Sequence, residues 1–240
     1  MPKEHFSVIF KEKIREFKKV IAVDSDKSLS IRSILLGSIC EGVSEIKNLL
    51  ESEDSISSIN FVKKLGIKVK KIKKGYLIFG KGLGGFSNSK KLKIDLGNSG
   101  TLCRLGSALL ATNRNIDLKI VGDKSLNKRD LKTLIKLLMD FGATFYPKNR
   151  SQLPLKLISS DIPVGIKYVE KKGSAQIKSA AILAGLNAFG KTTILVEKES
   201  RDHTENLLKN LGAKITKKKI KKNYLIEVEG KQPLRPFKIN

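Results

Sequence analysis

Three segments of the chain consist of apolar and small residues at almost every position, and each predicts a helix. They are Ser33–Cys40, Leu105–Ala111 and Ser179–Leu186. A helix that is apolar on all sides has no face suited to water, so we expect these three helices in the interior. Other runs alternate apolar and polar residues, as in Tyr224–Glu229. This period of two predicts strands in sheets that expose one face to solvent.

The same order of elements recurs three times along the chain. A polar segment precedes each apolar helix, and the equivalent positions Lys27, Thr101 and Ala175 lie 74 residues apart. In each copy a second helix stops at a glycine, and a β-type run follows. These glycines are Gly66, Gly142 and Gly212. A period of this length indicates one supersecondary unit used three times, which places three helix N-termini in equivalent positions.

Length and composition favour one continuous domain. The chain has 240 residues, 40% of them hydrophobic, and its six prolines mark no linker. We assign residues 21–236 to the three-repeat domain, residues 1–20 to an N-terminal arm and residues 237–240 to a crossover beyond it. No apolar run approaches the length of a membrane span, and the start lacks the apolar core of a signal peptide. We therefore expect a cytoplasmic protein that does not enter a membrane.

The formal charge of +25 invites a nucleic-acid interpretation, but the residue types argue against it. Of the 48 basic residues 40 are Lys, which are scattered over predicted exposed faces and hairpins, and Trp is absent. Proteins that read nucleic acids more often use Arg with interleaved aromatic side chains. The charge suits an anionic small substrate equally well. A non-catalytic protein that binds anions or nucleic acid stays as an alternative.

The histidines and cysteines do not suggest a metal or a catalytic triad. Two His and two Cys without ligand spacing predict no metal site, and no nucleophile-elbow sequence surrounds a serine. Cys40 and Cys103 lie in predicted helices and indicate a reducing compartment. Cys103 stands near a helix start, where a thiol can be reactive, but its neighbours Leu102 and Leu105 favour a core position.

The arginines are more informative than the lysines. Guanidinium groups suit carboxylate and phosphate, and helix N-termini attract the same anions. The four arginines that fall in motif-like polar segments are Arg32, Arg104, Arg129 and Arg201. A site formed by the polar helix starts would suit a substrate with phosphate, carboxylate and hydroxyl groups. Its members would be Lys27, Ser28, Arg32, Ser174 and Gln176.

Simpler structural roles exist for the same segments. Asp26 and Ser28 are of the types that cap helices, and Gly97–Thr101 has the composition of a strand-to-helix turn. His203 would then be a surface residue in a first helical turn. The recurrence of the polar segments in register across three repeats favours a functional interpretation.

Five motifs resemble, in order and spacing, those of the 3-phosphoshikimate 1-carboxyvinyltransferases, a family also called EPSP synthases. The resemblance extends over nearly the whole chain, so neither chance nor a shared fold alone accounts for it. The motifs are Asp-Lys-Ser-x-Ser-x-Arg from Asp26, Leu-Gly-Asn-Ser-Gly-Thr-x-x-Arg from Leu96, Gly-Asp-x-Ser-Leu-x-x-Arg from Gly122, Ser-Ala-Gln-Ile-Lys from Ser174 and Ser-Arg-Asp-His-Thr-Glu from Ser200.

The resemblance implies a fold and a reaction. The fold is an α/β structure, an inverse α/β prism of three βαβαββ units around a pseudo-threefold axis, with helices inside and sheets outside. The reaction transfers the enolpyruvyl group of phosphoenolpyruvate to the 5-hydroxyl of shikimate 3-phosphate and releases phosphate, without a metal or organic cofactor. It belongs to aromatic amino acid biosynthesis. The alternative is the related transferase that acts on UDP-N-acetylglucosamine, whose first motif typically pairs Lys with Asn where Ser28 follows Lys27 here.

The resemblance also implies roles for individual residues. Lys27 would be catalytic and meet both substrates, and Gly100 would let the backbone approach the small enolpyruvate closely. The implied shikimate 3-phosphate ligands are Lys27, Ser28, Arg32, Ser174, Gln176, Ser200 and Arg201. The implied phosphoenolpyruvate ligands are Lys27, Gly100, Arg129 and Gln176.

The chain departs from the family pattern in sequence and in length. Asp24-Ser25 replaces Pro-Gly before the first motif, and Leu105 and Asp130 replace prolines after motif arginines. Family members are nearly twice as long, and their second domain supplies an Asp base, a Lys and arginines for phosphoenolpyruvate. In them the arm before Val20 lies with that second domain. We therefore expect a half-enzyme, either a fragment or one product of a split gene, that is inactive alone and is completed by a C-terminal half.

Overall fold

The computed structural model describes residues 9, 11, 20–21, 23–87 and 92–239. Within these residues the predicted threefold repeat is confirmed. The N-terminal arm that the sequence assigns to residues 1–20 lies outside the described residues, apart from Ile9, Lys11 and Val20.

The three units share one order of elements, which is a buried helix, a strand, a second helix and a hairpin. The first unit contains α1 (Lys27–Ile39), β1 (Glu41–Lys47), α2 (Glu53–Lys64), β2 (Lys68–Ile72) and β3 (Gly75–Lys81). The second contains β4 (Leu92–Asp95), α3 (Gly100–Thr112), β5 (Asp117–Val121), a 3-10 turn (Leu126–Lys128), α4 (Lys132–Asp140), β6 (Thr144–Tyr146) and β7 (Leu155–Ile158). The third contains β8 (Lys167–Glu170), α5 (Ala175–Asn187), β9 (Lys191–Val196), α6 (His203–Asn210), β10 (Ile215–Ile220) and β11 (Asn223–Glu229).

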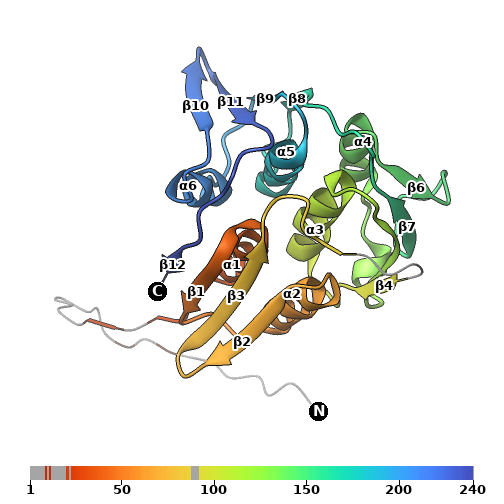
Figure 1. Ribbon diagram of the computed structural model, residues 1–240. Helices are drawn as coiled ribbons and strands as arrows, with labels where there is room; N and C mark the ends of the chain where they lie inside the picture. Colours follow the sequence, from red (N-terminus) through yellow and green to blue (C-terminus); the bar gives the residue numbers. More distant parts are fainter. Residues whose placement is uncertain (1–8, 10, 12–19, 22, 88–91, 240) are drawn as a thin grey trace.

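Each unit builds a four-stranded sheet with the same pattern of pairing. The strand orders are β12-β1-β3-β2, β4-β5-β7-β6 and β8-β9-β11-β10. In every sheet the first two strands are parallel and the other neighbours antiparallel. Figure 1 shows the sheets on the outside with α1, α3 and α5 between them. The predicted α/β fold of three similar units is therefore confirmed.

The first sheet takes its outermost parallel strand from the far end of the chain. β12 (Lys238–Ile239) pairs with Glu45 and Ile46 of β1, where β4 and β8 occupy the equivalent place in the other units. The backbone N–H of Glu45 also donates to the carbonyl of Phe237, at 2.8 Å. Thus the residues that the sequence assigns to a crossover beyond the domain supply a strand to the first repeat.

The three interior helices begin earlier than their apolar segments, inside the polar motifs. Asp26, Ser99 and Ser174 are their N-caps, and each side chain accepts a hydrogen bond from a backbone N–H three residues later. A cap of this kind satisfies one of the free N–H groups of a first turn. The capping role suggested for Asp26 is thus confirmed, whereas Ser28 lies within α1 rather than at its cap.

The glycines predicted to stop the second helices do so in all three units. Gly66, Gly142 and Gly212 follow α2, α4 and α6 with φ values of +82°, +94° and +80°. The left-handed conformation that ends a helix in this way carries little penalty for glycine, which has no Cβ.

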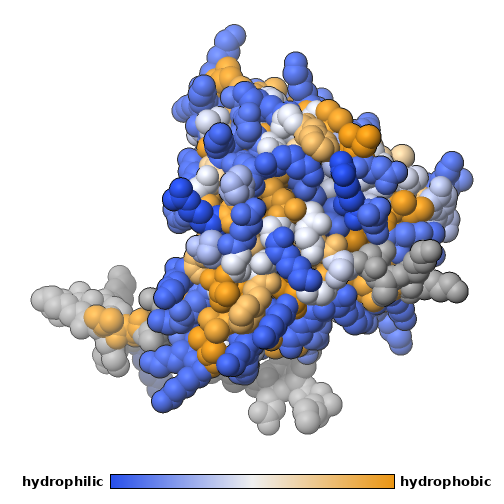
Figure 2. Space-filling model, viewed as in Figure 1, coloured by the Kyte–Doolittle hydropathy of each residue, from blue (hydrophilic) through white to orange (hydrophobic). Residues whose placement is uncertain are grey.

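One face of the molecule is largely hydrophilic, as the scattered lysines predict. Figure 2 shows one face, on which hydrophilic side chains predominate and hydrophobic ones form small separate patches. In the part of the chain that the structure describes, no helix has the length and apolar character needed to cross a membrane.

Both cysteines are core residues, as their apolar neighbours predict. Cys40 and Cys103 have no exposed surface. Burial raises the pKa of Cys40 from 9.0 to about 12. Burial likewise raises the pKa of Cys103 from 9.0 to about 11, against the smaller opposing effect of Arg104. Burial in apolar surroundings makes a thiol inert because the reactive species is the thiolate.

We expect neither thiol to react with a disulfide reagent at pH 8 faster than the protein unfolds. Because the pKa values of both thiols are higher in the folded than in the unfolded protein, the neutral thiols contribute to the free energy of unfolding. This contribution is fully present below pH 9 and is lost as the pH rises through about 11 to 12. Thiol titration of the native and the urea-unfolded protein checks this expectation, with Cys40→Ala and Cys103→Ala separating the two sites. Rapid modification of either thiol in the native protein would contradict it.

Candidate anion-binding site

The starts of the three interior helices are connected by polar side chains. The Gln176 side chain near the start of α5 donates from Nε2 to Thr101 Oγ1 in the first turn of α3, at 3.0 Å. Arg32 of α1 donates from Nη2 to Ser179 Oγ of α5, at 3.4 Å. Three helix N-termini, each with free backbone N–H groups and a partial positive charge, therefore lie around one region, which favours an anion there.

Arg32 is a buried cation of this region. It is 5% exposed, and its pKa is lowered by burial and then by the nearby Arg201 guanidinium. Nε donates to Thr204 Oγ1 at 2.9 Å and Nη1 to the Ser28 carbonyl at 3.0 Å, in addition to the bond from Nη2 to Ser179. A guanidinium has five N–H donors. These three bonds to described residues leave two, one on each terminal nitrogen, for a ligand.

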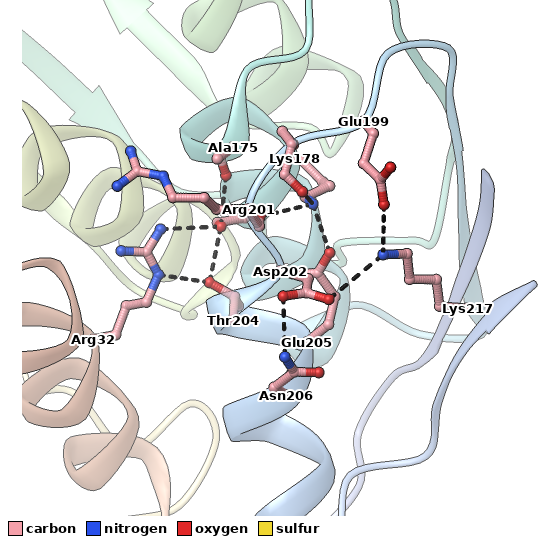
Figure 3. A network of polar contacts seen from close by, with 12 residues as sticks. Arg32, Ala175, Lys178, Glu199, Arg201, Asp202, Thr204, Glu205, Asn206 and Lys217 are labelled. Carbon is pink, nitrogen blue, oxygen red and sulfur yellow. Dashed lines mark hydrogen bonds and ion pairs between the residues drawn. The ribbon is translucent and has the colours of Figure 1, made fainter. Parts of the chain in front are cut away.

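Arg201 brings a second guanidinium to the same place. It lies in the loop before α6, and Figure 3 shows its side chain directed to the same side of the α6 start as that of Arg32. The side chain of Arg201 is exposed, whereas that of Arg32 is buried. Two like charges near each other repel, so an anion between the two guanidiniums would remove an unfavourable interaction.

Ser200, beside Arg201, carries a hydroxyl that is not satisfied. Its Oγ is buried and has no hydrogen-bond partner among the described residues. A buried polar atom without a partner costs about 1–3 kcal/mol, so such atoms in native proteins commonly face a ligand or a water. The unsatisfied hydroxyl makes Ser200 a candidate ligand in the loop that also carries Arg201.

Two further arginines approach the start of α3. A Cβ at Gly100 would lie 2.5 Å from Arg129 Nη1 and 3.1 Å from Arg104 Nη1. Asn98 Oδ1 accepts from Arg129 Nη2 at 3.0 Å, and the Gly100 carbonyl accepts from Arg104 Nη1 at 2.9 Å. In this structure the missing side chain of Gly100 makes room for a guanidinium, and the close approach of a substrate at Gly100 stays a prediction.

Lys27 is placed at the edge of this region rather than inside it. Its side chain is 53% exposed, and Nζ lies 3.4 Å from Asp54 Oδ2 of α2. Ser28 contributes its carbonyl to Arg32, and Ser174 is engaged as the N-cap of α5. The structure thus brings Ser28 into contact with Arg32, and Gln176 into contact with the start of α3 beside Gly100. Lys27 is paired with Asp54, so a ligand would have to compete with that carboxylate for the ammonium.

A hollow adjoins the site. Arg104 and Ser174 line a cavity of about 330 Å³ that also includes Tyr168, Lys171 and Lys172. A larger cavity of about 920 Å³ runs along β5 beside Lys119 and contains none of the motif residues. Among the described residues no cluster of His, Cys, Asp or Glu could hold a metal ion. The helix starts themselves present cations, hydroxyls and backbone amides.

Sequence reasoning missed a buried ion pair beneath the Ser200–Arg201 loop. Lys178 Nζ lies 2.8 Å from Glu205 Oε1, and the two side chains are 2% and 1% exposed. Both residues stand inside the quoted motifs, but a lysine and a glutamate are ordinarily expected on the surface. The available signal was the position of Lys178, which immediately precedes an apolar helical segment and follows Ile177.

Comparison with known proteins places the chain among enolpyruvyl transferases. A family model described as EPSP synthase (3-phosphoshikimate 1-carboxyvinyltransferase) matches residues 11–240. The 3-phosphoshikimate 1-carboxyvinyltransferase of Sulfurihydrogenibium sp. is 37% identical over 230 residues, which are 95% of this chain and 53% of the relative. That of Ruthia magnifica is 40% identical over 212 residues, or 88% of this chain and 47% of the relative. The chain thus spans about half the length of the curated relatives that it matches.

Solved structures agree with the sequence comparisons. The EPSP synthase from Acinetobacter baumannii superimposes with a TM-score of 0.82 and 32% sequence identity, covering 91% of this chain and 48% of that chain. The enolpyruvyl transferase NikO from Streptomyces tendae gives a TM-score of 0.66 at 14% identity, covering 92% of this chain and 51% of that chain. The second likeness concerns the fold alone.

Proposed function

Because the chain belongs to the EPSP synthase family, we propose that it provides the shikimate 3-phosphate site of a 3-phosphoshikimate 1-carboxyvinyltransferase. The complete enzyme transfers the enolpyruvyl group of phosphoenolpyruvate to the 5-hydroxyl of shikimate 3-phosphate and releases phosphate. The chain spans about half of its relatives, so turnover is proposed for the completed enzyme and binding for this chain. A second chain equivalent to the remaining half of the relatives should restore turnover.

The observation that carries this proposal is the pair of guanidiniums at Arg32 and Arg201. Arg32 keeps two N–H donors beyond its three internal bonds, and its pKa is lowered by burial and then by the adjacent Arg201. A phosphate dianion between the two groups would accept charge-assisted hydrogen bonds from both, which are about twice as strong as neutral ones. The buried hydroxyl of Ser200 supports a further bond to the same phosphate.

The remaining ligands follow from their places around the helix starts. Ser28, Ser174 and Gln176 would bind the hydroxyls and ring of shikimate 3-phosphate, and Gln176 would also contact the enolpyruvyl group. Arg129 and the backbone at Gly100 would bind phosphoenolpyruvate at the start of α3. Two anions in one site need fixed cations, and catalysis there consists mainly of positioning and electrostatic stabilisation.

Lys27 would contact both substrates and act in the chemical step. To do so, its ammonium has to leave Asp54, which lies 3.4 Å away. An exposed pair of this kind is worth at most about 1 kcal/mol, so the charge of a bound phosphate is sufficient to redirect the lysine.

Calorimetric titration of the chain with shikimate 3-phosphate at moderate salt tests the proposal. We expect saturable one-to-one binding, and no binding of UDP-N-acetylglucosamine. Equal and salt-labile binding of any polyanion would instead support the non-catalytic alternative, because such binding is driven by counterion release. A folded chain that binds neither ligand would contradict the proposed function.

Replacing Gly100 by Ala tests the phosphoenolpyruvate end of the site. The new Cβ would stand 2.5 Å from Arg129 Nη1, so the guanidinium must move. Arg129 has an exposed, flexible side chain, and we therefore expect unchanged stability but about tenfold weaker binding of phosphoenolpyruvate to the protein saturated with shikimate 3-phosphate. In an Arg129→Ala background the Gly100→Ala change should have no further effect. Equal losses in both backgrounds would show that Arg129 is not the cause.

A further inference from the structure

Two lysines hold the loop that carries Ser200 and Arg201, and they hold it in different ways (Figure 3). Lys178 of α5 reaches it from the interior, and its Nζ donates to the Arg201 carbonyl at 2.9 Å and to the Ser200 carbonyl at 3.2 Å. Lys217 of β10 contacts only side chains, with Nζ 3.8 Å from Glu199 Oε1 and 3.5 Å from Asp202 Oδ2. Only Lys178 binds the backbone of the two proposed phosphate ligands.

The ammonium of Lys178 has three close oxygen neighbours in this position. It donates to the carbonyls of Ser200 and Arg201, and Nζ lies 2.8 Å from Glu205 Oε1 as an ion pair. Neither carboxylate oxygen of Glu205 has a hydrogen-bond partner among the described residues, so the ion pair is its main compensation. Both charged side chains are almost completely buried. Removing two charges from water is so costly that a buried ion pair is weak support for stability, and fixing one geometry is a better-attested reason for such a pair.

A second polar contact between α5 and α6 lies beside the Lys178–Glu205 pair and is formed by the adjacent residues Ser179 and Thr204. Thr204 of α6 donates to Ser179 Oγ at 2.8 Å and accepts from Arg32, and Ser179 in turn donates to the Ala175 carbonyl at 2.7 Å. Thus Ser179 and Thr204 orient Arg32, and Lys178 and Glu205 orient the backbone of Arg201. Consecutive residues of α5 and of α6 set the positions of the two guanidiniums relative to each other.

We propose that the buried Lys178–Glu205 pair is a positioning element, which fixes the Ser200–Arg201 backbone so that the Arg201 guanidinium meets the same phosphate group as Arg32. The inference rests on the proposed function for the identity of that phosphate. Lys178 and Glu205 do not contact the ligand themselves. They act through Arg201, and this indirect action distinguishes them from binding residues.

The test compares a single and a double variant of the full chain. Lys178→Met alone leaves Glu205 buried without a partner, so the double variant Lys178→Met/Glu205→Leu serves as the variant that folds, since a buried pair can be replaced by apolar residues of similar volume. Lys217→Met is the matched control, because it removes a lysine of β10 that contacts side chains of the same loop and leaves the two carbonyls with their donor. Each is also made in an Arg201→Ala background.

Amide hydrogen exchange of residues 199–204 is measured first, without ligand. In the double variant we expect these amides to exchange at least tenfold faster, with those of Ala175–Leu186 unchanged. Affinity for shikimate 3-phosphate should fall about tenfold, while affinity for unphosphorylated shikimate stays constant. In the Arg201→Ala background the double variant should cause no further loss. Lys217→Met should stay within twofold of wild type throughout.

Three results would overturn the inference. They are wild-type exchange of the loop in the double variant, equal losses of affinity for the phosphorylated and unphosphorylated ligands, and an undiminished loss in the Arg201→Ala background. A wild-type chain that binds no shikimate 3-phosphate would contradict the proposed function instead. The exchange measurement, which needs no ligand, would then decide by itself whether Lys178 and Glu205 hold the loop.

Discussion

Arg32→Ala is expected to weaken the binding of shikimate 3-phosphate about a hundredfold, which corresponds to ~3 kcal/mol. The substitution removes the two N–H donors left for the phosphate and also the three internal bonds to Thr204, Ser28 and Ser179. Charge-assisted hydrogen bonds contribute about 1.5–3 kcal/mol each, so the loss of a two-donor contact accounts for an effect of this size. Calorimetry on the folded variant measures it.

Arg32→Lys provides the conservative comparison. A lysine keeps the charge but presents a point charge in place of a planar fork, so we expect an affinity about tenfold below wild type, between those of wild type and Arg32→Ala. Arg235→Ala removes an exposed arginine near Gly212, at the opposite end of α6 from Thr204, and should leave binding unchanged. An Arg32→Ala variant within twofold of wild type would remove the main support for the proposed phosphate site.

Lys178→Met alone is expected to lower the free energy of unfolding by about 3–5 kcal/mol. The substitution leaves Glu205 buried at 1% exposure without its ion-pair partner, and it also leaves the carbonyls of Ser200 and Arg201 without their donor. The double variant Lys178→Met/Glu205→Leu should lie much closer to wild type, because it removes both charges together. Urea unfolding of the three proteins, followed by circular dichroism, measures the difference.

Lys217→Met again supplies the control, this time for stability. Its ion pairs lie at 3.5 and 3.8 Å and involve partly exposed carboxylates, so its removal should cost less than about 1 kcal/mol. A double variant as unstable as Lys178→Met would mean that the packing of the lysine stem, not the unpaired charge of Glu205, is what stabilises this region. A loss below about 1 kcal/mol in the single variant would mean that the unpaired Glu205 carboxylate is not left in a costly environment.

The repeat architecture was predictable because its signals are local. Gly66, Gly142 and Gly212 end their helices in the left-handed conformation that glycine adopts most easily, and the apolar segments lie in the interior as their uniform character predicts. The helix starts were also found, since the equivalent positions of the three motifs fall within one residue of the first residues of α1, α3 and α5. Each of these signals depends on residues adjacent in the sequence.

The connections within the candidate site were not predictable in the same way. Lys178 and Glu205 are ordinary surface residue types, and their pairing depends on how α5 packs against α6 rather than on any periodicity. The use of the space at Gly100 by Arg129, which lies 29 residues later, is likewise a tertiary contact. The sequence indicated which polar segments matter, and the structure adds which of their side chains already have internal partners and which keep donors for a ligand.

The strand β12 has a consequence for how the protein is made. A ribosome delivers the first repeat before the others, yet the parallel neighbour of β1 comes from Lys238 and Ile239, at the other end of the chain. The sheets of the second and third repeats contain only strands from their own segments, so they can form as each segment emerges from the exit tunnel. The repeat that is translated first is therefore the last to complete its sheet, and until then the outer edge of β1 is open to pairing with another nascent chain.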